Sequence, residues 1–321
     1  MIKSKTIPPK GAAATVKNGT GAGWGRYFRD YWQLYLLIIP AVVFTIIFCY
    51  YPMYGAQIAF RDYKFSKGFF GSEWVGLKHF ERYITSSNFW TLLRNTLVIN
   101  LHNLLVGFPA PIILSLMLNE LGSERYKKTV QMIIYAPHFI SVVTMCGMVR
   151  LFLQRETGVI NILLMLLGGT GQDWLSKPEM FSTIYVLSGV WQNVGWGTII
   201  YLAALSGVDP QIIEAAKIDG ASRFQKIIYI DLPSILPTVT ILLIMTLGSM
   251  MSTGFEKVLL LQNQLNIERS DVFATFVYRL GIKDAQYSYT TAVGLFNSVV
   301  NVILLASFNW LAKVSTKTSL W

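Results

Sequence analysis

Charged residues are scarce in this chain. Only 14% of its 321 residues are charged, while 53% are hydrophobic. A soluble domain carries about 25% charged residues, so the deficit excludes an ordinary soluble globular domain and indicates a membrane protein. Cysteine is equally rare: Cys49 and Cys146 both lie in apolar segments. Small buried hydrophobes are favoured there over a disulfide or a metal site.

Several chemical motifs are missing as well. The three histidines form no His/Cys cluster with metal-ligand spacing, so no metal is expected. There is no GxxxxGK[ST] phosphate loop, and the chain should therefore not hydrolyse ATP itself. Acidic residues are scattered, which disfavours a membrane enzyme that needs carboxylates or a metal at an interface. The net charge of +10 is not gathered into a basic helix, a finger or a dense block, so no nucleic acid is expected.

Long apolar segments are what the chain does contain. A helix that crosses a bilayer needs about 20 mostly apolar residues. The sequence predicts an all-α membrane protein with six such helices, at about 33–52, 92–118, 130–152, 182–205, 234–252 and 290–312. The apolar stretch 158–167 is too short to cross and is predicted to cap the outer face. No Asp or Glu lies deep in any of the six segments, which argues against a proton-coupled pump using His102 or His138.

The N-terminal region differs from the rest in composition. Residues 1–23 are rich in Lys, Gly, Ala and Thr without apolar periodicity, and we expect a disordered cytoplasmic tail. Residues 24–32 interleave aromatic and basic side chains, which predicts an interfacial helix. No apolar core of a signal peptide occurs in the first 30 residues, so we expect no cleaved leader. Residues 33–321 form the predicted membrane domain.

The distribution of Lys and Arg predicts the orientation. With the N-terminus inside, the cytoplasmic segments carry 14 basic residues and the outer segments carry 11, although the inner segments are shorter in sum. Basic residues are enriched in cytoplasmic loops. We therefore expect both termini in the cytoplasm and the long loops 53–90 and 252–290 outside.

The insert at 206–233 separates the fourth and fifth predicted spans. Pro233 stands where the fifth span is expected to begin. Its stretch 212–233 cannot cross a bilayer because it is charged at six positions: Glu214, Lys217, Asp219, Arg223, Lys226 and Asp231. On the orientation above it faces the cytoplasm.

The capping and turn residues of this insert predict two short helices joined at a glycine, which we call the elbow. Asp209 reads as an N-cap followed by proline, and a short helix over 210–219 should follow. Gly220 fits the left-handed position after a helix end. Ser222 with Gln225 forms a capping box for a second helix. A plain surface hairpin remains an alternative on these grounds alone.

One pattern in the elbow carries a family resemblance. The pattern resembles the motif of permease subunits in binding-protein-dependent ABC importers. It consists of E-A-A, then G after three further residues, then I-x-L-P after nine further residues. The matching residues are Glu214, Ala215, Ala216, Gly220, Ile230, Leu232 and Pro233. These are seven fixed residues within 20 positions, with no departure, before the penultimate span.

Four further stretches resemble the carbohydrate-uptake branch of this family. They are "WVGLKHFERY" (74–83), "FWTLLRNTLVIN" (89–100), "GFEKVLLLQN" (254–263) and "YSYTTAVGLFNSVVN" (287–301). Within the branch they look like permeases for larger oligosaccharides, a group that includes alginate importers. The likeness covers nearly all of the chain after residue 30.

The resemblance implies a set of partners and a mechanism. The chain would pair with a second permease in the bacterial cytoplasmic (inner) membrane, above two ATPase subunits that bind ATP and Mg²⁺. An extracytoplasmic binding protein would deliver an oligosaccharide. The elbow would be the coupling helix: Glu214 would contact an ATPase subunit, Ala215, Ala216 and Gly220 would allow a close fit, and Asp219 belongs to the same set. Transport would proceed by alternating access.

Polar residues within the predicted spans are candidates for a sugar path. Amides suit sugar hydroxyls and aromatic faces suit the apolar faces of sugar rings. We expect Trp191, Gln192, Asn193 and Asn297 to line the path, because polar groups in spans tend to face a cavity. The alternative is that such amides hold helices together.

Two alternatives concern the substrate. A permease of the same architecture for a polyol, an osmolyte or an amino acid would share the elbow motif, so the choice of an oligosaccharide depends on the four less specific stretches. Arg94 and Arg150 lie near the outer ends of spans. They either attract an anionic sugar or, as interface anchors usually do, reach toward the headgroups.

Overall fold

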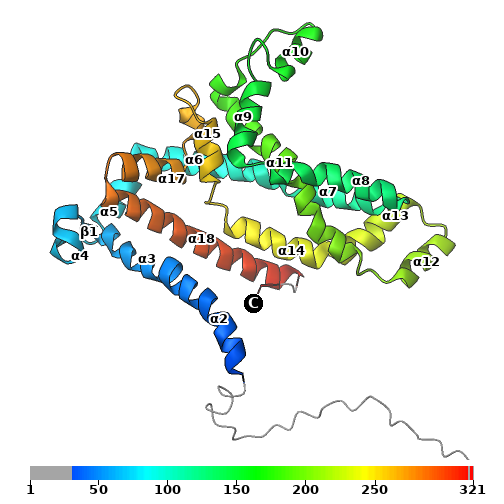
Figure 1. Ribbon diagram of the computed structural model, residues 1–321, viewed down its shortest axis with the longest axis horizontal. Helices are drawn as coiled ribbons and strands as arrows, with labels where there is room; N and C mark the ends of the chain where they lie inside the picture. The colour runs from blue at the N-terminus through cyan, green and yellow to red at the C-terminus, as the bar shows by residue number, and fades with distance from the viewer. Residues whose placement is uncertain (1–30, 317–318, 321) are drawn as a thin grey trace, which may run out of the picture. The chain divides into compact units, whose positions relative to one another are not determined.

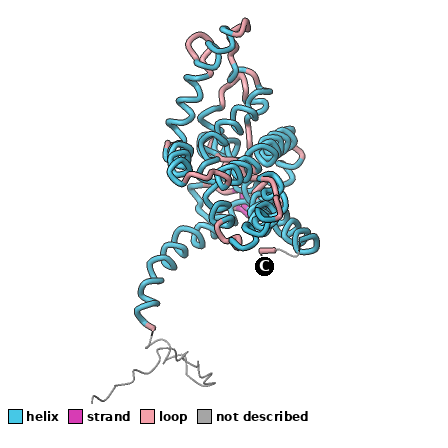
Figure 2. The backbone as a smooth tube through the Cα atoms, turned by 90° about the vertical axis from the view of Figure 1, so that its right-hand side faces the viewer, coloured by secondary structure: helices cyan, strands magenta, loops and turns pink. Residues whose placement is uncertain are grey.

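The structure is a computed structural model that describes residues 31–316 and 319–320. The predicted tail at 1–23 and nearly all of the predicted interfacial helix at 24–32 lie outside these residues. The described chain is almost entirely helical, as Figure 2 shows, with one short pair of strands. It divides into two units, one ending at Gly55 and one from Ala56 onward. Each is described by itself.

The first unit contains the first predicted span. Its helix is built from α2 (Trp32–Thr45), the π-helical turn η1 (Ile46–Tyr50) and α3 (Tyr51–Met53). An apolar helix extends over Trp32–Phe60, with a mean hydropathy of 2.3. None of the side chains in α2 is buried. A helix that is apolar all round requires lipid or partner helices as its surroundings, as expected for a span.

The second predicted span is one continuous helix, Ser87–Asn119. It consists of α6 (Ser87–His102), the π-helical turn η4 (Asn103–Gly107) and α7 (Pro109–Asn119). The loop before it, which is predicted to lie outside, holds the antiparallel pair β1 (Arg61–Asp62) and β2 (Glu73–Trp74), with η2, η3, α4 and α5 at Tyr54–Phe60, Phe65–Lys67, Gly68–Gly71 and Lys78–Ile84. The helix includes the predicted 92–118 and begins five residues earlier, at Ser87.

The third predicted span, 130–152, is not a single straight helix. It contains α8 (Glu124–Tyr135), the 3₁₀ turn η5 (Ala136–Phe139) and α9 (Val142–Phe152), and its two halves meet at 99°. Pro137 interrupts the helical hydrogen bonds, and the Ser141 hydroxyl caps the new helix by accepting from the Thr144 amide. The proline within this predicted span suggested a kink, and the structure shows two helices that meet at a sharp bend there.

The fourth predicted span, 182–205, corresponds to α11 (Phe181–Leu205). The short helix α10 (Val159–Leu166) and the 3₁₀ turns η6 (Trp174–Ser176) and η7 (Pro178–Met180) precede it. After α11 the chain bends by 82° into α12 (Pro210–Ile218). The short stretch predicted at 158–167 is thus a separate helix of eight residues.

The fifth predicted span begins earlier than expected. One apolar helix extends over Arg223–Gly248, built from α13 (Arg223–Lys226), the π-helical turn η8 (Ile227–Asp231) and α14 (Leu232–Gly248). Pro233 does not start this helix. It lies two residues after the last residue of the π-helical turn, whose wider hydrogen-bond ring makes room for a residue without an amide donor. The second helix of the elbow is therefore continuous with the span.

The sixth predicted span is α18 (Tyr287–Thr316), which includes the expected 290–312. The outer connection before it contains α15 (Phe255–Leu261), α16 (Ile267–Ser270), α17 (Phe273–Val277) and η9 (Tyr278–Lys283). In the part of the chain that the structure describes, four helices are long and apolar enough to cross a membrane, or up to six if each bent pair is one span. The all-α membrane fold is confirmed, and the count of six stays a prediction.

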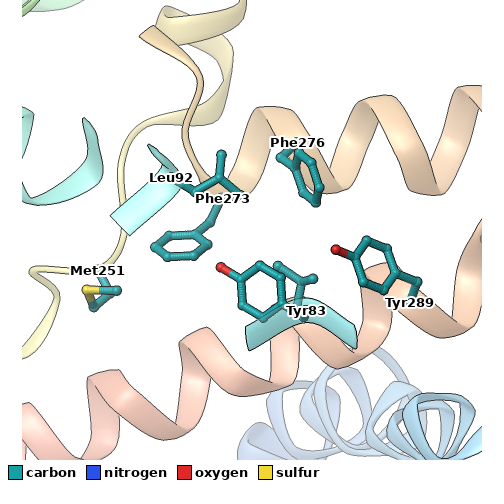
Figure 3. Packing of buried hydrophobic residues seen from close by; sticks show 7 residues of the cluster. Tyr83, Leu92, Met251, Phe273, Phe276 and Tyr289 are labelled. Atoms are coloured by element: carbon teal, nitrogen blue, oxygen red, sulfur yellow. The ribbon is translucent and has the colours of Figure 1, made fainter. Parts of the chain in front are cut away.

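Within the second unit, α14 lies beside α18 and α7 beside α11, with α12 and α13 at one end and α5 and α17 at the other (Figure 1). A buried cluster of Tyr83, Leu92, Met251, Phe273, Phe276, Tyr289 and Val293 closes the end near α17 (Figure 3). Its rings meet edge to face, with Tyr83 and Tyr289 centroids 6.3 Å apart. A second cluster of Leu116, Tyr201, Leu205 and Ile235 packs the elbow end.

Candidate functional site

The elbow adopts the local geometry that its sequence predicts. The Asp209 carboxylate accepts from the Gln211 amide at 2.9 Å, and Gly220 has φ 76°. Ser222 and Gln225 form both bonds of the capping box, at 3.3 Å and 2.8 Å. A residue with a Cβ is strained at positive φ, so glycine at position 220 sets the turn. The predicted helix–Gly–helix shape is confirmed.

The predicted coupling residues lie on an open surface of this elbow. Glu214, Ala215, Asp219 and Gly220 are exposed, and Ala216 is half-buried. Apolar side chains accompany them: Ile218 is 86% exposed and Phe224 is 70% exposed. Exposed apolar side chains next to small residues are typical of a surface that another protein covers.

A charged cluster connects the elbow to the end of the second span. Lys226 Nζ lies 2.5 Å from Glu120 Oε1 and 3.4 Å from Asp231 Oδ2. Asp231 is fully buried. Sequence reasoning missed this cluster, because Glu120 and Lys226 lie 106 positions apart and no local pattern pairs them.

A cavity of about 590 Å³ lies between the second, fourth and fifth predicted spans. That size is in the range of sites that hold small ligands. Its lining includes amides, hydroxyls and aromatic rings, among them Asn100, Asn103, Asn193, Ser249, Phe108, Tyr185 and Tyr201. The cavity extends from Tyr201, near the elbow end of α11, to Tyr185 at the opposite end.

The structure does not bring the four predicted path residues together. Asn193 lines the cavity, where its amide donates to the Gly189 carbonyl at 3.1 Å and its oxygen accepts from His138 Nδ1 at 3.0 Å. Gln192 is buried on another face of α11, and Trp191, 44% exposed, is absent from the cavity lining. Asn297 lines a second, adjoining cavity of about 320 Å³.

Gln192 has a structural partner instead. Its Nε2 donates to the Ile140 carbonyl at 2.8 Å, at the break between η5 and α9, where the helix cannot satisfy that carbonyl itself. The neighbouring residue Asn193 points the other way because consecutive helical residues differ by 100°. Asn297 keeps a buried amide oxygen that has no hydrogen-bond partner, which leaves an acceptor for a hydroxyl in the second cavity.

Other amides in the spans hold helices together. Asn301 accepts from the Met251 amide and donates to the Ser252 hydroxyl, both at 3.0 Å. Asn100 donates to the Thr253 hydroxyl at 2.9 Å. Arg150 Nη2 donates to the Leu260 carbonyl and so fastens α9 to α15. Interhelical bonds of this kind are the alternative considered for polar residues in spans.

Lys257 is the functional candidate that sequence reasoning missed. It lies on α15, is 9% exposed and lines the end of the cavity near Tyr185. A signal was available in the sequence, because Lys257 interrupts the apolar run of "GFEKVLLL" where a lysine has no local reason to be buried. For metals, the described residues contain no group of three or more His, Cys, Asp or Glu placed to hold an ion.

Comparison with known proteins places the chain in a family. Residues 107–316 match the model of the binding-protein-dependent transport system inner membrane component. Protein LplB of Bacillus subtilis (strain 168) is 45% identical over 96% of this chain and 97% of its own. The polygalacturonan/rhamnogalacturonan transport system permease protein YteP of the same organism is 46% identical over 87% of each chain.

A solved structure agrees with these relatives. A chain from the crystal structure of a bacterial alginate ABC transporter, in complex with an alginate pentasaccharide-bound periplasmic protein, superimposes with a TM-score of 0.85. It is 39% identical, and the match covers 92% of this chain and 99% of that chain. The capped elbow, the bent helices and these matches lead to one conclusion: the chain belongs to the family of inner membrane components of binding-protein-dependent transport systems.

Proposed function

We propose that this chain is the membrane-spanning permease subunit of an ATP-driven importer, and that it passes an oligosaccharide delivered by an extracytoplasmic binding protein. One observation carries the proposal: the complete seven-residue motif folds as an exposed, capped elbow continuous with a predicted span. Because the elbow is continuous with a membrane helix, a displacement of the elbow by a partner protein can move that helix.

The coupling step uses the surface of α12. Its helix inserts into a groove of a separate ATPase subunit, with Glu214 and Asp219 at the contact and Ala215, Ala216 and Gly220 allowing close approach. The exposed side chains of Ile218 and Phe224 supply apolar area to the same contact. ATP and Mg²⁺ bind to the ATPase subunits, and this chain is not an enzyme.

The substrate path uses the two cavities. Asn193 in the larger cavity and Asn297 in the smaller one offer amides to sugar hydroxyls, and Trp191 and Gln192 belong to the surrounding helix. Relatives described as carrying polygalacturonan, rhamnogalacturonan and alginate support an oligosaccharide. A second permease subunit closes the path from the other side, and alternating access moves the sugar across.

The decisive experiment purifies the chain with its partner permease, ATPase subunits and binding protein in liposomes. ATPase activity should rise with an oligosaccharide from a panel of neutral and acidic sugars. Stimulation only by a polyol, an osmolyte or an amino acid would replace the sugar assignment but keep the architecture. Robust ATP turnover by this chain alone would overturn the permease assignment.

A further inference from the structure

Lys257 brings a buried cation to one end of the larger cavity. Its Nζ donates to the Tyr185 carbonyl at 2.6 Å and lies 4.4 Å from the centre of the Tyr185 ring. Tyr185 is near the start of α11, 20 residues before Leu205, which corresponds to about 30 Å along a helix. The ammonium therefore lies at the end of the cavity remote from the elbow.

No carboxylate balances this charge in the part of the chain that the structure describes. The three ion pairs found there involve Lys226 and Arg279, not Lys257. Glu256 is next in sequence but is exposed to solvent. A buried ammonium without a counter-ion is costly, and one carbonyl and one ring face replace only part of its hydration.

The surroundings of Lys257 are shaped around its ammonium. A Cβ placed on Gly189 would lie 2.9 Å from Lys257 Nζ, so glycine at this position leaves room for the lysine to reach the cavity. Gly189 also supplies the carbonyl to which Asn193 donates. The ammonium of Lys257 and the amide of Asn193 therefore both lie next to Gly189 of α11.

We propose that Lys257 is the anion-binding residue of the cavity and that it takes a carboxylate of an acidic sugar unit. This role of Lys257 rests on the oligosaccharide function proposed above and makes the substrate a negatively charged oligosaccharide. The ammonium donates to the carboxylate, and the Asn193 amide meets a neighbouring hydroxyl. A carboxylate supplies the missing counter-ion, and a charge-assisted bond of this kind is stronger than a neutral one.

The protonation of Lys257 makes this site dependent on pH. Burial lowers the pKa of Lys257 to about 8. The groups that face it are the Tyr185 ring and the Cys146 thiol, and the Arg150 guanidinium and the Glu256 carboxylate act on that same thiol. A bound carboxylate favours the ammonium, so affinity for an acidic sugar is full below pH 8. It falls as pH rises above 8, by at most about tenfold per pH unit.

The test uses the assembled transporter in liposomes with its binding protein. The probes are oligogalacturonate and oligomannuronate, each paired with its fully methyl-esterified form, and uptake and direct binding are measured.

Lys257→Met should weaken binding of the acidic probe by about 10- to 100-fold, as removal of a charged hydrogen bond does. Lys257→Arg should retain most of it, and Gly189→Ala should fall between. Lys283→Met, an exposed lysine of η9 outside the cavity lining, is the matched control.

Each outcome decides between the two proposals. Preference for the acidic probe that disappears in Lys257→Met supports the inference, while equal binding in wild type and Lys257→Met overturns it. Uptake of neutral sugars alone also overturns it but leaves the oligosaccharide function standing. Failure of every oligosaccharide rejects the proposed function itself. If Lys257→Met does not assemble, the wild-type pH profile decides: acidic-probe affinity that does not fall anywhere between pH 7 and 10 contradicts a role for Lys257.

Discussion

At the scale of the residue, amides of the same type perform different tasks. Gln192 and Asn193 are neighbours on α11, yet Gln192 satisfies the Ile140 carbonyl at a helix break and Asn193 lines the cavity. Composition cannot separate these roles, because Gln192 and Asn193 each have a partner more than 50 positions away in sequence, at Ile140 and His138. The two residues therefore allow a matched comparison.

Substituting these neighbours should separate stability from transport. Gln192→Ala leaves a buried carbonyl unpaired, and we expect a loss of about 1–3 kcal/mol, seen as a lower Tm of the purified complex. Asn193→Ala should leave Tm nearly unchanged, because its bonds are exposed, and should reduce uptake several-fold. An unchanged Tm in Gln192→Ala would contradict the structural role of that amide.

At the scale of the element, the elbow is more closely joined to the membrane helices than its sequence suggests. Its second helix continues into the fifth span, and Lys226 connects it to Glu120 at the end of the second span. Under the proposed function, these two connections would pass a movement of the elbow to two predicted spans. The π-helical turn η8 at Ile227–Asp231 lies between elbow and span, and such turns occur often at functional sites.

Removing the central cation of this cluster should destabilise the junction. Lys226→Met leaves the fully buried Asp231 without its partner, which costs about 3–5 kcal/mol for a buried pair. The double variant Lys226→Met with Asp231→Asn should recover most of the loss, because the uncompensated charge is gone. Thermal unfolding of the purified complex measures both, and an equally unstable double variant would show that the pairing is not the cause.

A charge at Ala216 should uncouple the transporter. Ala216→Glu places a long charged side chain on the face of α12 that we assign to the ATPase contact. We expect insertion of the chain to be normal, uptake to fall at least tenfold, and ATP hydrolysis to lose its response to substrate. Ala216→Ser, which adds one small atom, is the control. Normal substrate-stimulated ATPase activity in Ala216→Glu would reject the assigned contact.

At the scale of the whole molecule, the membrane orientation rests on a modest excess of basic residues on one side. Cysteine labelling tests it in a background with Cys49→Ser and Cys146→Ala. Ala13→Cys should react with an impermeant thiol reagent only in inside-out vesicles, because both termini are expected in the cytoplasm. Ser66→Cys, in the predicted outer loop, should react only from the opposite side. Reversed labelling would invert the orientation and place the elbow outside.

Local patterns in the sequence sufficed for the class of fold, for most of the helices and for the elbow. Each depends on interactions within a few residues: apolar length sets a span, a side-chain cap starts a helix, and glycine permits a positive φ. The 99° break at Pro137 shows the limit, since the proline was visible in the sequence but the Gln192 amide, which donates to the Ile140 carbonyl at the break, comes from a distant helix.

Tertiary folding was needed to place the polar groups of the transport path. Packing against distant helices buries Gln192, leaves Asn193 in one cavity and Asn297 in another, and brings Lys257 to the Tyr185 carbonyl across 72 positions of sequence. Hydrogen bonds and burial depend on which side chains meet in space, whereas periodicity reports only which face of a helix they share. The chain thus encodes its helices locally and its site globally.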